Sequence, residues 1–330
     1  MGKKTLPKKN QFGFYELRLE SIGGLGANVA GKIIAEAGVV GMGLNGSNFA
    51  SYGSEKKGTP VSSFIRFCDI TQPIKINSPV TEPHLLGVFH ENLATRIPIT
   101  AGVKPDATIV INTDKDPKKA REYLRLAGGN IFTVDAIKIA YQEKVRMNVV
   151  MIGAITKAMG FISKEAVKEA IRETFGKKYQ NQLEANLRGF EAGYSQVEQG
   201  EFQEDGRFPI VSFKEVEGDW GYENAPIGGV ILEAGSSILK NNQTSRQGKI
   251  PIFHLKKCIH CGLCETTCPD YCFSFKEKED TKTGKINIFN EGVDYQFCKG
   301  CLRCVDVCPV EALTEELEAE HDIEKITIKL

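Results

Sequence analysis

The sequence lacks the features that would direct a protein to nucleic acid, to a membrane or out of the cell. Its 330 residues hold 42 Lys and Arg against 42 Asp and Glu, so no basic footprint favours nucleic acid or anionic lipid. No apolar run approaches the roughly 20 residues of a membrane helix. The basic start MGKKTLPKKN leads into a mixed stretch and not into the apolar core of a secretory signal. We therefore expect a cytoplasmic chain with protein partners.

The sequence also has little that would support a disulfide framework or catalysis by this chain. Nine of its ten cysteines fall between residues 258 and 308, and in a chain without an export signal such clustered thiols indicate metal. Residues 1–200 contain no convincing nucleophile, triad or carboxylate pair. We expect no catalytic residues here and place catalysis on another chain.

The first 198 residues alternate between strand-like and helix-like segments. Short runs rich in apolar, β-branched or aromatic residues predict strands at 14–22, 61–67, 85–90, 106–113 and 129–136. Amphipathic or apolar segments with helix start and stop signals predict helices at 28–41, 117–129, 148–160, 163–176 and 180–197. This alternation predicts an α/β, Rossmann-like layered domain with a mainly parallel sheet over residues 1–198.

The rest of the chain divides into a connector and a cysteine-rich domain. Residues 199–250 are poor in long apolar runs and rich in proline, glycine and polar residues, which predicts an extended connector. Residues 251–330 contain the cysteine motifs, with a hairpin turn expected at Thr283 and Gly284. The alternating stretch IEKITIKL, at 323–330, predicts an edge strand.

Two copies of the pattern CxxCxxCxxxCP form an internal repeat. The first copy begins at Cys258 and the second at Cys298. The first copy comprises Cys258, Cys261, Cys264, Cys268 and Pro269, and the second comprises Cys298, Cys301, Cys304, Cys308 and Pro309. Three cysteines two residues apart lie on a tight loop that can wrap one cubane, and the fourth leaves the loop on a helical turn. In the bacterial two-cluster ferredoxins that these motifs resemble, the fourth cysteine ligates the other cluster.

Crossed ligation gives a definite expectation for two [4Fe–4S] clusters in an α+β ferredoxin domain. Cluster A would use Cys258, Cys261, Cys264 and Cys308, and cluster B would use Cys298, Cys301, Cys304 and Cys268. Gly262 and Gly300 would let backbone approach each cubane. Structural zinc is the alternative, but it prefers two separated CxxC knuckles and would leave the third and fourth cysteines without a role.

Three further residues lie near these motifs or elsewhere in the chain and have roles of their own. Cys272 is expected to be a packed or exposed thiol and not a ligand. His260 either donates to a cluster sulfur or points to solvent. Cys68, in the predicted strand at 61–67 and its continuation, is interpreted as a core residue.

A glycine turn follows the first predicted strand. GGLG at 23–26 suggests a turn that binds a dinucleotide. However, Val29 stands where the dinucleotide-binding motif has its third glycine, and no acidic residue stands about 20 residues further on. We interpret the turn first as close packing of strand and helix, and next as a contact for another subunit or a cofactor tail. The loop at 52–60, with Lys56 and Lys57, either binds an anion or is a solvated turn.

The order of these segments resembles one known family along nearly the whole chain. GGLGANVAGKIIAEAG, YGSEKKGTPVSSFIR and EANLRGFEAGY are similar to the gamma domain of the 2-oxoacid:ferredoxin oxidoreductases. The segment PIGGVILEAGSS at 226–237, Arg246, KKCIHCGLCETTCP and VDYQFCKGC are similar to the delta subunit of these enzymes. The resemblance is to a gamma–delta fusion.

The chain departs from the family pattern at two places. Leu25 stands where the glycine turn usually has Gln, and Lys57, Gly58 and Thr59 stand where Arg-Gly-Gly is usual. With these substitutions the fused chain is most similar to the delta chain of oxalate oxidoreductases, which implies cleavage of oxalate to two CO2 without coenzyme A. Pyruvate with coenzyme A is the alternative substrate.

The resemblance also implies partners and cofactors. Thiamine diphosphate with Mg²⁺, and a further [4Fe–4S] cluster, would lie on alpha and beta subunits, with external ferredoxin as the electron acceptor and a dimer of heterotrimers as the assembly. Two other classes of protein compete with this interpretation. A stand-alone ferredoxin fused to a ligand-binding domain would be a redox-active monomer, and an NAD-linked reductase would bind nucleotide at the glycine turn.

Overall fold

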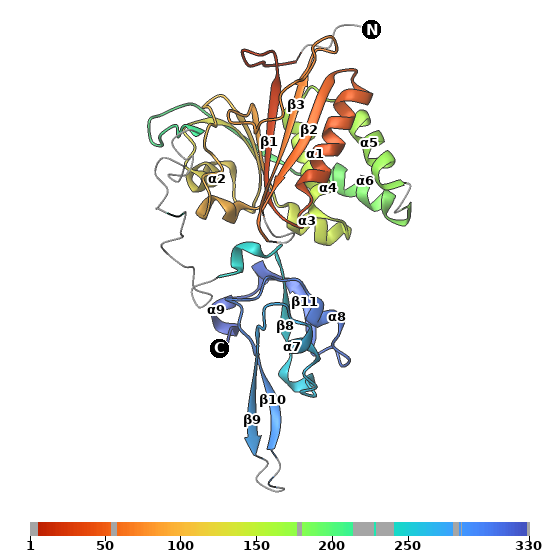
Figure 1. Ribbon diagram of the computed structural model, residues 1–330, viewed down its shortest axis with the longest axis vertical. Coiled ribbons are helices and arrows are strands. Elements are labelled where there is room, and N and C mark those ends of the chain that lie inside the picture. Colours follow the sequence, from red (N-terminus) through yellow and green to blue (C-terminus); the bar gives the residue numbers. More distant parts are fainter. Residues whose placement is uncertain are drawn as a thin grey trace. The chain divides into compact units, whose positions relative to one another are not determined.

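The chain forms two compact units, Met1–Gly221 and Tyr222–Leu330, each with a hydrophobic core of its own. In the computed structural model (Figure 1), the described residues are 6–53, 58–176, 180–213, 228, 241–279, 284 and 286–328. No helix within these ranges is both long and apolar enough to cross a membrane. The segment PIGGVILEAGSS, apart from Gly228, lies outside the described residues, as do Lys56 and Lys57.

A seven-stranded sheet with the order β2-β3-β1-β4-β5-β6-β7 forms the centre of the first unit. Its strands are β1 (Tyr15–Ile22), β2 (Asn45–Tyr52), β3 (Pro60–Cys68), β4 (Leu85–Val88), β5 (Thr108–Asn112), β6 (Gly129–Val134) and β7 (Glu198–Phe202). The four central strands β1, β4, β5 and β6 run parallel, and β3, β2 and β7 extend the sheet antiparallel at its edges. This confirms the α/β fold class with a mainly parallel central sheet.

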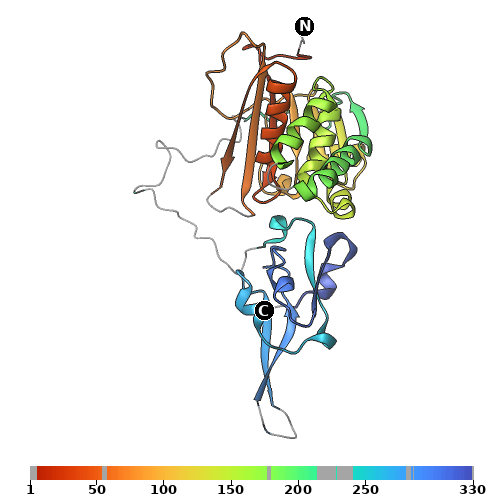
Figure 2. The ribbon, with the colours of Figure 1, turned by 90° about the vertical axis from the view of Figure 1, so that its right-hand side faces the viewer.

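Six longer helices surround this sheet: α1 (Ala27–Glu36), α2 (Pro117–Leu124), α3 (Ala136–Glu143), α4 (Met147–Met159), α5 (Lys164–Gly176) and α6 (Leu183–Ser195). Helices α1, α4, α5 and α6 lie on one side of the sheet and α2 on the other (Figures 1 and 2). Helix α2 begins as predicted, because the Asp116 side chain accepts a hydrogen bond from the backbone N–H of Lys119 and Pro117 occupies the first turn.

Helix α4 is almost wholly buried because α6 packs against it at unusually short range. Gly153 of α4 faces the backbone oxygen of Phe190, and Gly193 of α6 faces the backbone oxygen of Val150. A methyl group at either glycine would overlap the backbone of the opposite helix. The two glycines therefore set the distance between the helices.

Two strands and one α-helix of the first unit, β2, β7 and α3, were not predicted. The sequence of β2, NGSNFASY, has low strand propensity, but it pairs with β3 along its whole length. Helix α3 is short and β7 is polar, so neither has a strong periodic signal. In each case tertiary contacts decide the conformation and local propensity does not.

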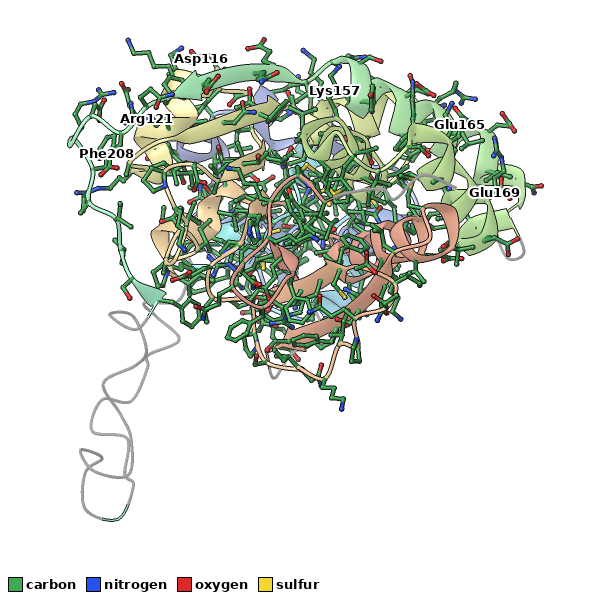
Figure 3. The ribbon with its side chains drawn as sticks, turned by 90° about the horizontal axis from the view of Figure 1, so that it is seen from above. Asp116, Arg121, Lys157, Glu165, Glu169 and Phe208 are labelled. Atoms are coloured by element: carbon green, nitrogen blue, oxygen red, sulfur yellow. The ribbon has the colours of Figure 1, made fainter. Side chains whose placement is uncertain are left out.

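The first unit continues past residue 198, where the extended connector was expected to begin. Strand β7 pairs with β6, and Arg121, which is 3% exposed, makes two hydrogen bonds to the Asp205 carboxylate. The Arg121 guanidinium also lies over the ring of Phe208, which is beside it in Figure 3. Further on, the N–H of Gly102 donates to the backbone oxygen of Val211. Residues 198–211 thus pack on the first unit, because a buried guanidinium requires partners that this segment supplies.

The second unit is built from two similar halves. Its elements are β8 (Lys249–Phe253), α7 (Leu263–Thr267), β9 (Phe273–Glu279), β10 (Ile286–Val293), α8 (Arg303–Asp306), β11 (Leu313–Leu317) and α9 (Ile323–Ile326). Strand β9 pairs with β10, starting from Phe273 opposite Val293, and β11 pairs with β8, starting from Leu313 opposite Phe253. Phe273 and Leu313, and likewise Phe253 and Val293, are therefore separated in the sequence by the same number of residues as Cys258 and Cys298, and they occupy equivalent places in the two halves.

Of two predictions about the second unit, the structure contains the hairpin but not the edge strand at the described end of the chain. Strands β9 and β10 form the antiparallel hairpin expected around the turn, in which Gly284 has φ +65° and Thr283 lies outside the described residues. The edge strand predicted over 323–330 was wrong for its described part. Residues Ile323–Ile326 form a short helix, because the partly buried Ile323 packs against the core and the chain turns there before the N–H of Ile328 reaches the backbone oxygen of Val293.

Candidate iron–sulfur centres

Two pockets lie in the second unit and are lined by cysteines. The cysteines that line the first pocket are Cys258, Cys261, Cys264 and Cys308. Those that line the second are Cys268, Cys272, Cys298, Cys301 and Cys304. Each pocket thus draws three cysteines from one motif and the fourth motif cysteine from the other. All ten cysteines of the chain are free thiols.

Backbone amides donate to the cysteine sulfurs in a pattern that repeats between the pockets. The N–H of His260 lies 3.4 Å from Sγ of Cys258, and the N–H of Gly300 lies 3.5 Å from Sγ of Cys298. After the fourth cysteines, the N–H of Cys272 donates to Cys268 at 3.4 Å and that of Ala312 to Cys308 at 3.2 Å. Amides aimed at sulfur stabilise thiolates, which is how proteins support iron–sulfur clusters.

Left-handed backbone at two positions of each loop makes these amide contacts possible. In the first loop His260 has φ +56° and Gly262 φ +79°; in the second, Gly300 has φ +65° and Leu302 φ +62°. The conformation repeats at equivalent positions of the two motifs, but only one of the two positions in each loop is glycine. The sequence analysis identified Gly262 and Gly300 as backbone positions but not the left-handed backbone of His260 and Leu302, which comparison of the two repeats position by position could have found.

The surroundings of Cys264 and Cys268 shift the pKa values of their thiols in opposite directions. Burial raises the pKa of Cys264 to about 12, so this side chain binds as a thiolate only where a metal supplies positive charge. A hydrogen bond with Cys272 lowers the pKa of Cys268 to about 6. Among the described residues no three His, Cys, Asp or Glu side chains lie close enough to hold one ion. The four motif cysteines that line each pocket are the donor set that a [4Fe–4S] cubane takes.

The structure places the residues with uncertain roles more definitely. Cys272 is 2% exposed, and hydrogen bonds to Cys268 and Cys298 raise the pKa of its thiol, which keeps it protonated. Nδ1 of His260 accepts the backbone N–H of Asn290 at 3.0 Å, and its ring lies 4.8 Å from that of Phe289. Nδ1 therefore cannot donate to a sulfur.

Arg246, noted in the sequence only through resemblance, is buried beside the second pocket. Its side chain is 2% exposed, and its Nε donates to the backbone oxygen of Cys298 at 2.9 Å. The remaining donors reach the backbone oxygen of Tyr295 and the carboxylate of Glu318. The guanidinium thus fixes the start of the second cysteine loop, and Glu318 balances its charge.

In the first unit, the glycine turn and the end of the loop at 52–60 lie side by side. The N–H of Gly23 donates to the backbone oxygen of Thr59 at 2.8 Å, and the N–H of Gly58 donates back to the oxygen of Gly23. Gly26 has φ +83°, and a methyl group there would lie 2.7 Å from Nδ2 of the buried Asn148. Leu25 is 5% exposed. Close packing, our first interpretation of the turn, accounts for these contacts.

Cys68 is fully buried at the end of β3, in agreement with its interpretation as a core residue. Burial is also the main reason why the pKa of this thiol is raised.

An α/β unit joined to a unit with two pockets, each lined by four motif cysteines, defines the class of this molecule: it is an iron–sulfur protein of the dicluster type with an additional layered domain. The model of the 4Fe-4S dicluster domain matches residues 257–312. The model of the pyruvate ferredoxin/flavodoxin oxidoreductase family matches residues 16–196, which is more than half of the chain. The chain belongs to this family.

Curated relatives are similar to the first unit. The common gamma subunit of the pyruvate/ketoisovalerate oxidoreductases from Thermococcus kodakarensis is 35% identical over 162 residues, which are 48% of this chain and 86% of that protein. Pyruvate synthase subunit PorC from Thermotoga maritima is 34% identical over 187 residues, 56% of this chain and 95% of that protein. The chain is therefore a gamma-type subunit that carries a dicluster domain as well.

A solved structure agrees with this fold. The crystal structure of the pyruvate oxidoreductase subunit PORC from Thermotoga maritima covers 57% of this chain and 99% of its own, with a TM-score of 0.50 and 31% identity. It supports the α/β architecture independently of the cysteine motifs.

Proposed function

We propose that this chain is the electron-transfer and scaffold subunit of a thiamine diphosphate-dependent 2-oxoacid:ferredoxin oxidoreductase in the cytoplasm. One observation carries the proposal: a gamma-type domain is continuous with a unit whose eight motif cysteines surround two pockets in crossed sets. We expect thiamine diphosphate, Mg²⁺ and a further [4Fe–4S] cluster on alpha and beta subunits, external ferredoxin as acceptor, and a dimer of heterotrimers.

The cysteine sets define two cluster sites. Cluster A is held by Cys258, Cys261, Cys264 and Cys308, and cluster B by Cys298, Cys301, Cys304 and Cys268. When bound, the clusters supply one-electron transfer. The chain's own contribution is to hold the cysteines by crossed loops, to stabilise the thiolates with backbone N–H groups and to bury the sulfurs.

Pairs of cysteine substitutions test the crossed assignment directly. With crossed ligation, Cys258→Ser and Cys308→Ser damage the same cluster, so the double variant should keep about four of its eight iron atoms. Cys258→Ser combined with Cys268→Ser damages both clusters and should leave almost none. The reverse result would show that each motif ligates its own cluster. Because both proteins carry two serine substitutions, each is the control for the other.

The substrate that we propose is oxalate, cleaved to two CO2 without coenzyme A. The support is the departure of the chain from the family pattern at Leu25, Lys57 and Thr59. Leu25 and Thr59 lie in two segments that hydrogen bonds join. Pyruvate with coenzyme A is the second candidate, and the names of the relatives from Thermococcus kodakarensis and Thermotoga maritima favour it.

Anaerobic purification of the native complex tests the function and the substrate together. Ferredoxin reduction is assayed with oxalate, pyruvate and 2-oxoglutarate, each with and without coenzyme A. Oxalate oxidation that does not require coenzyme A, with thiamine-binding chains in the complex, is the expected result. Activity on pyruvate alone would replace oxalate by the second candidate. An eight-iron monomer without partner chains would overturn the proposal and favour a stand-alone carrier.

A further inference from the structure

Asn290 is a buried amide beside cluster site A that no motif includes. It lies on β10, is 2% exposed, and lines the first pocket together with Cys264. Its Nδ2 lies 3.4 Å from Sγ of Cys264, which makes it a side-chain hydrogen-bond donor to a motif cysteine. The four hydrogen bonds described above come from backbone amides, which no side-chain substitution removes.

The orientation of the Asn290 amide is fixed by its other partners. Its Oδ1 accepts the N–H of Gly292 at 3.0 Å, so the opposite end of the amide, the NH2 group, must face Cys264. Its own backbone N–H donates to Nδ1 of His260, a residue of the first cysteine loop. A register shift between Asn290 and Gly292, a β-bulge, turns the amide to this place.

The second pocket has no such donor at the equivalent place. Asn290 pairs with Phe275 across the β9–β10 ladder, and the pair equivalent to it in the other half of the unit is Glu315 with Pro251. Pro251 lines the second pocket as Asn290 lines the first. Proline has neither a backbone N–H nor a polar side chain. The two halves of the unit therefore differ in hydrogen bonding to sulfur at an otherwise repeated position.

We propose that Asn290 sets the reduction potential of cluster A, by donating a hydrogen bond from its side-chain amide to Sγ of Cys264. The inference rests on the proposed cluster A ligands. Reduction adds negative charge to the cluster and its sulfurs, and a donor to sulfur stabilises the reduced form more than the oxidised form. Asn290 thus raises the potential of cluster A and leaves that of cluster B unchanged.

Two substitutions remove the donor in different ways. Asn290→Asp keeps an oxygen for the N–H of Gly292 and replaces only the NH2 group, while Asn290→Ala removes the whole amide without adding charge. Asn287→Ala is the matched control, because Asn287 lies exposed on the same strand, close to Asn290 in the sequence. The full chain is used in its anaerobically purified, iron-loaded complex.

The readout is a redox titration followed by electron paramagnetic resonance. In both Asn290 variants we expect the ratio of reduced to oxidised cluster A at a fixed potential to fall about ten-fold, a shift of about −59 mV for a one-electron couple. The step of cluster B and both steps of the Asn287→Ala control should stay unchanged. Asp should shift the step at least as far as Ala, because it also adds negative charge.

Other outcomes overturn the proposal. Fully loaded variants whose two steps do not move would show that the hydrogen bond has no effect on the potential. An equal shift of both steps, or a shift in the control, would show a general effect of the hairpin. Loss of about four irons in both variants would assign Asn290 a purely structural role at the bulge. A wild-type chain without eight irons would instead refute the cluster assignment itself.

Discussion

A methyl group at Gly300 should damage cluster site B far more than the same change at Gly262 damages site A. Both glycines lie in cysteine loops with positive φ, +65° and +79° respectively. At Gly262 a methyl group meets nothing within 4 Å. At Gly300 it would overlap the backbone oxygen of Lys249, with Cγ of Arg246 at 3.6 Å. The substitutions therefore share the backbone strain and differ in the steric overlap.

The expected magnitudes follow from these two contributions. Left-handed backbone costs a residue with a Cβ about 1–2 kcal/mol, and Leu302 shows that the position equivalent to Gly262 accepts a side chain. Overpacking against a backbone carbonyl adds about 1–3 kcal/mol at Gly300. Because Lys249 belongs to β8 and is held by pairing with β11, its oxygen cannot move alone. This difference in free energy between the two variants corresponds to a change of about ten-fold or more in the equilibrium constant for local opening of the loop.

The assay follows iron release from the full, iron-loaded chain into a chelator without oxygen, through the decay of the visible iron–sulfur absorption. Gly262→Ala should release iron faster than the unchanged chain only by the factor that the shared backbone strain accounts for, and Gly300→Ala should release about four irons at least ten-fold faster than Gly262→Ala does. Equal rates for the two variants would refute the reasoning, because they would mean that β8 yields to the methyl group without cost.

Three further predictions concern single side chains. Cys272→Ala should leave the iron content unchanged, because the equivalent position after the other fourth cysteine is Ala312; iron analysis checks this, and a loss of iron would make Cys272 a ligand. Gly193→Ala should lower the free energy of unfolding of the first unit by about 1–3 kcal/mol, because the methyl group overlaps the α4 backbone. Urea unfolding measures this, and an unchanged midpoint would contradict the close approach of the helices. Hydrogen bonding to Arg121 lowers the pKa of Asp205, so the stabilisation of the fold by this ion pair is complete at neutral pH and is lost as pH falls below about 4 towards the folded pKa. The difference in Tm between the unchanged chain and Asp205→Asn should therefore shrink over that range. A constant difference would exclude the ion pair as its cause.

The grouping of the cysteines around the two pockets shows how far a local pattern can carry a prediction. The spacing CxxCxxCxxxCP predicts both the tight loop and the departure of its fourth cysteine, since both are properties of a few consecutive residues. The structure brings each fourth cysteine to the pocket of the other motif. The strands β1, β3, β4, β5 and β6 were predicted for a similar reason, because each is a short apolar run with a clear boundary.

Elements without such a local signal could not be predicted. Strand β2 exists because β3 pairs with it, and the packing of residues 198–211 on the first unit depends on Arg121, far away in the sequence. The predicted edge strand at the end of the chain became a helix where Ile323 enters the core. Each of these features depends on contacts between distant residues, which periodicity within a segment does not record.

The sequence by itself determined the class of the two units, the cysteine spacing and the resemblance that leads to the family, since these are properties of short segments and of their order along the chain. Only the tertiary structure decided that His260 accepts a hydrogen bond, that Arg246 holds the second cysteine loop, and that Asn290 faces Cys264 while Pro251 takes the equivalent place. The reason is that a hydrogen bond depends on the distance and direction between two atoms, and a sequence repeat specifies neither. Here a β-bulge in one half of the unit turns the Asn290 side chain towards sulfur, and the repeat does not record it.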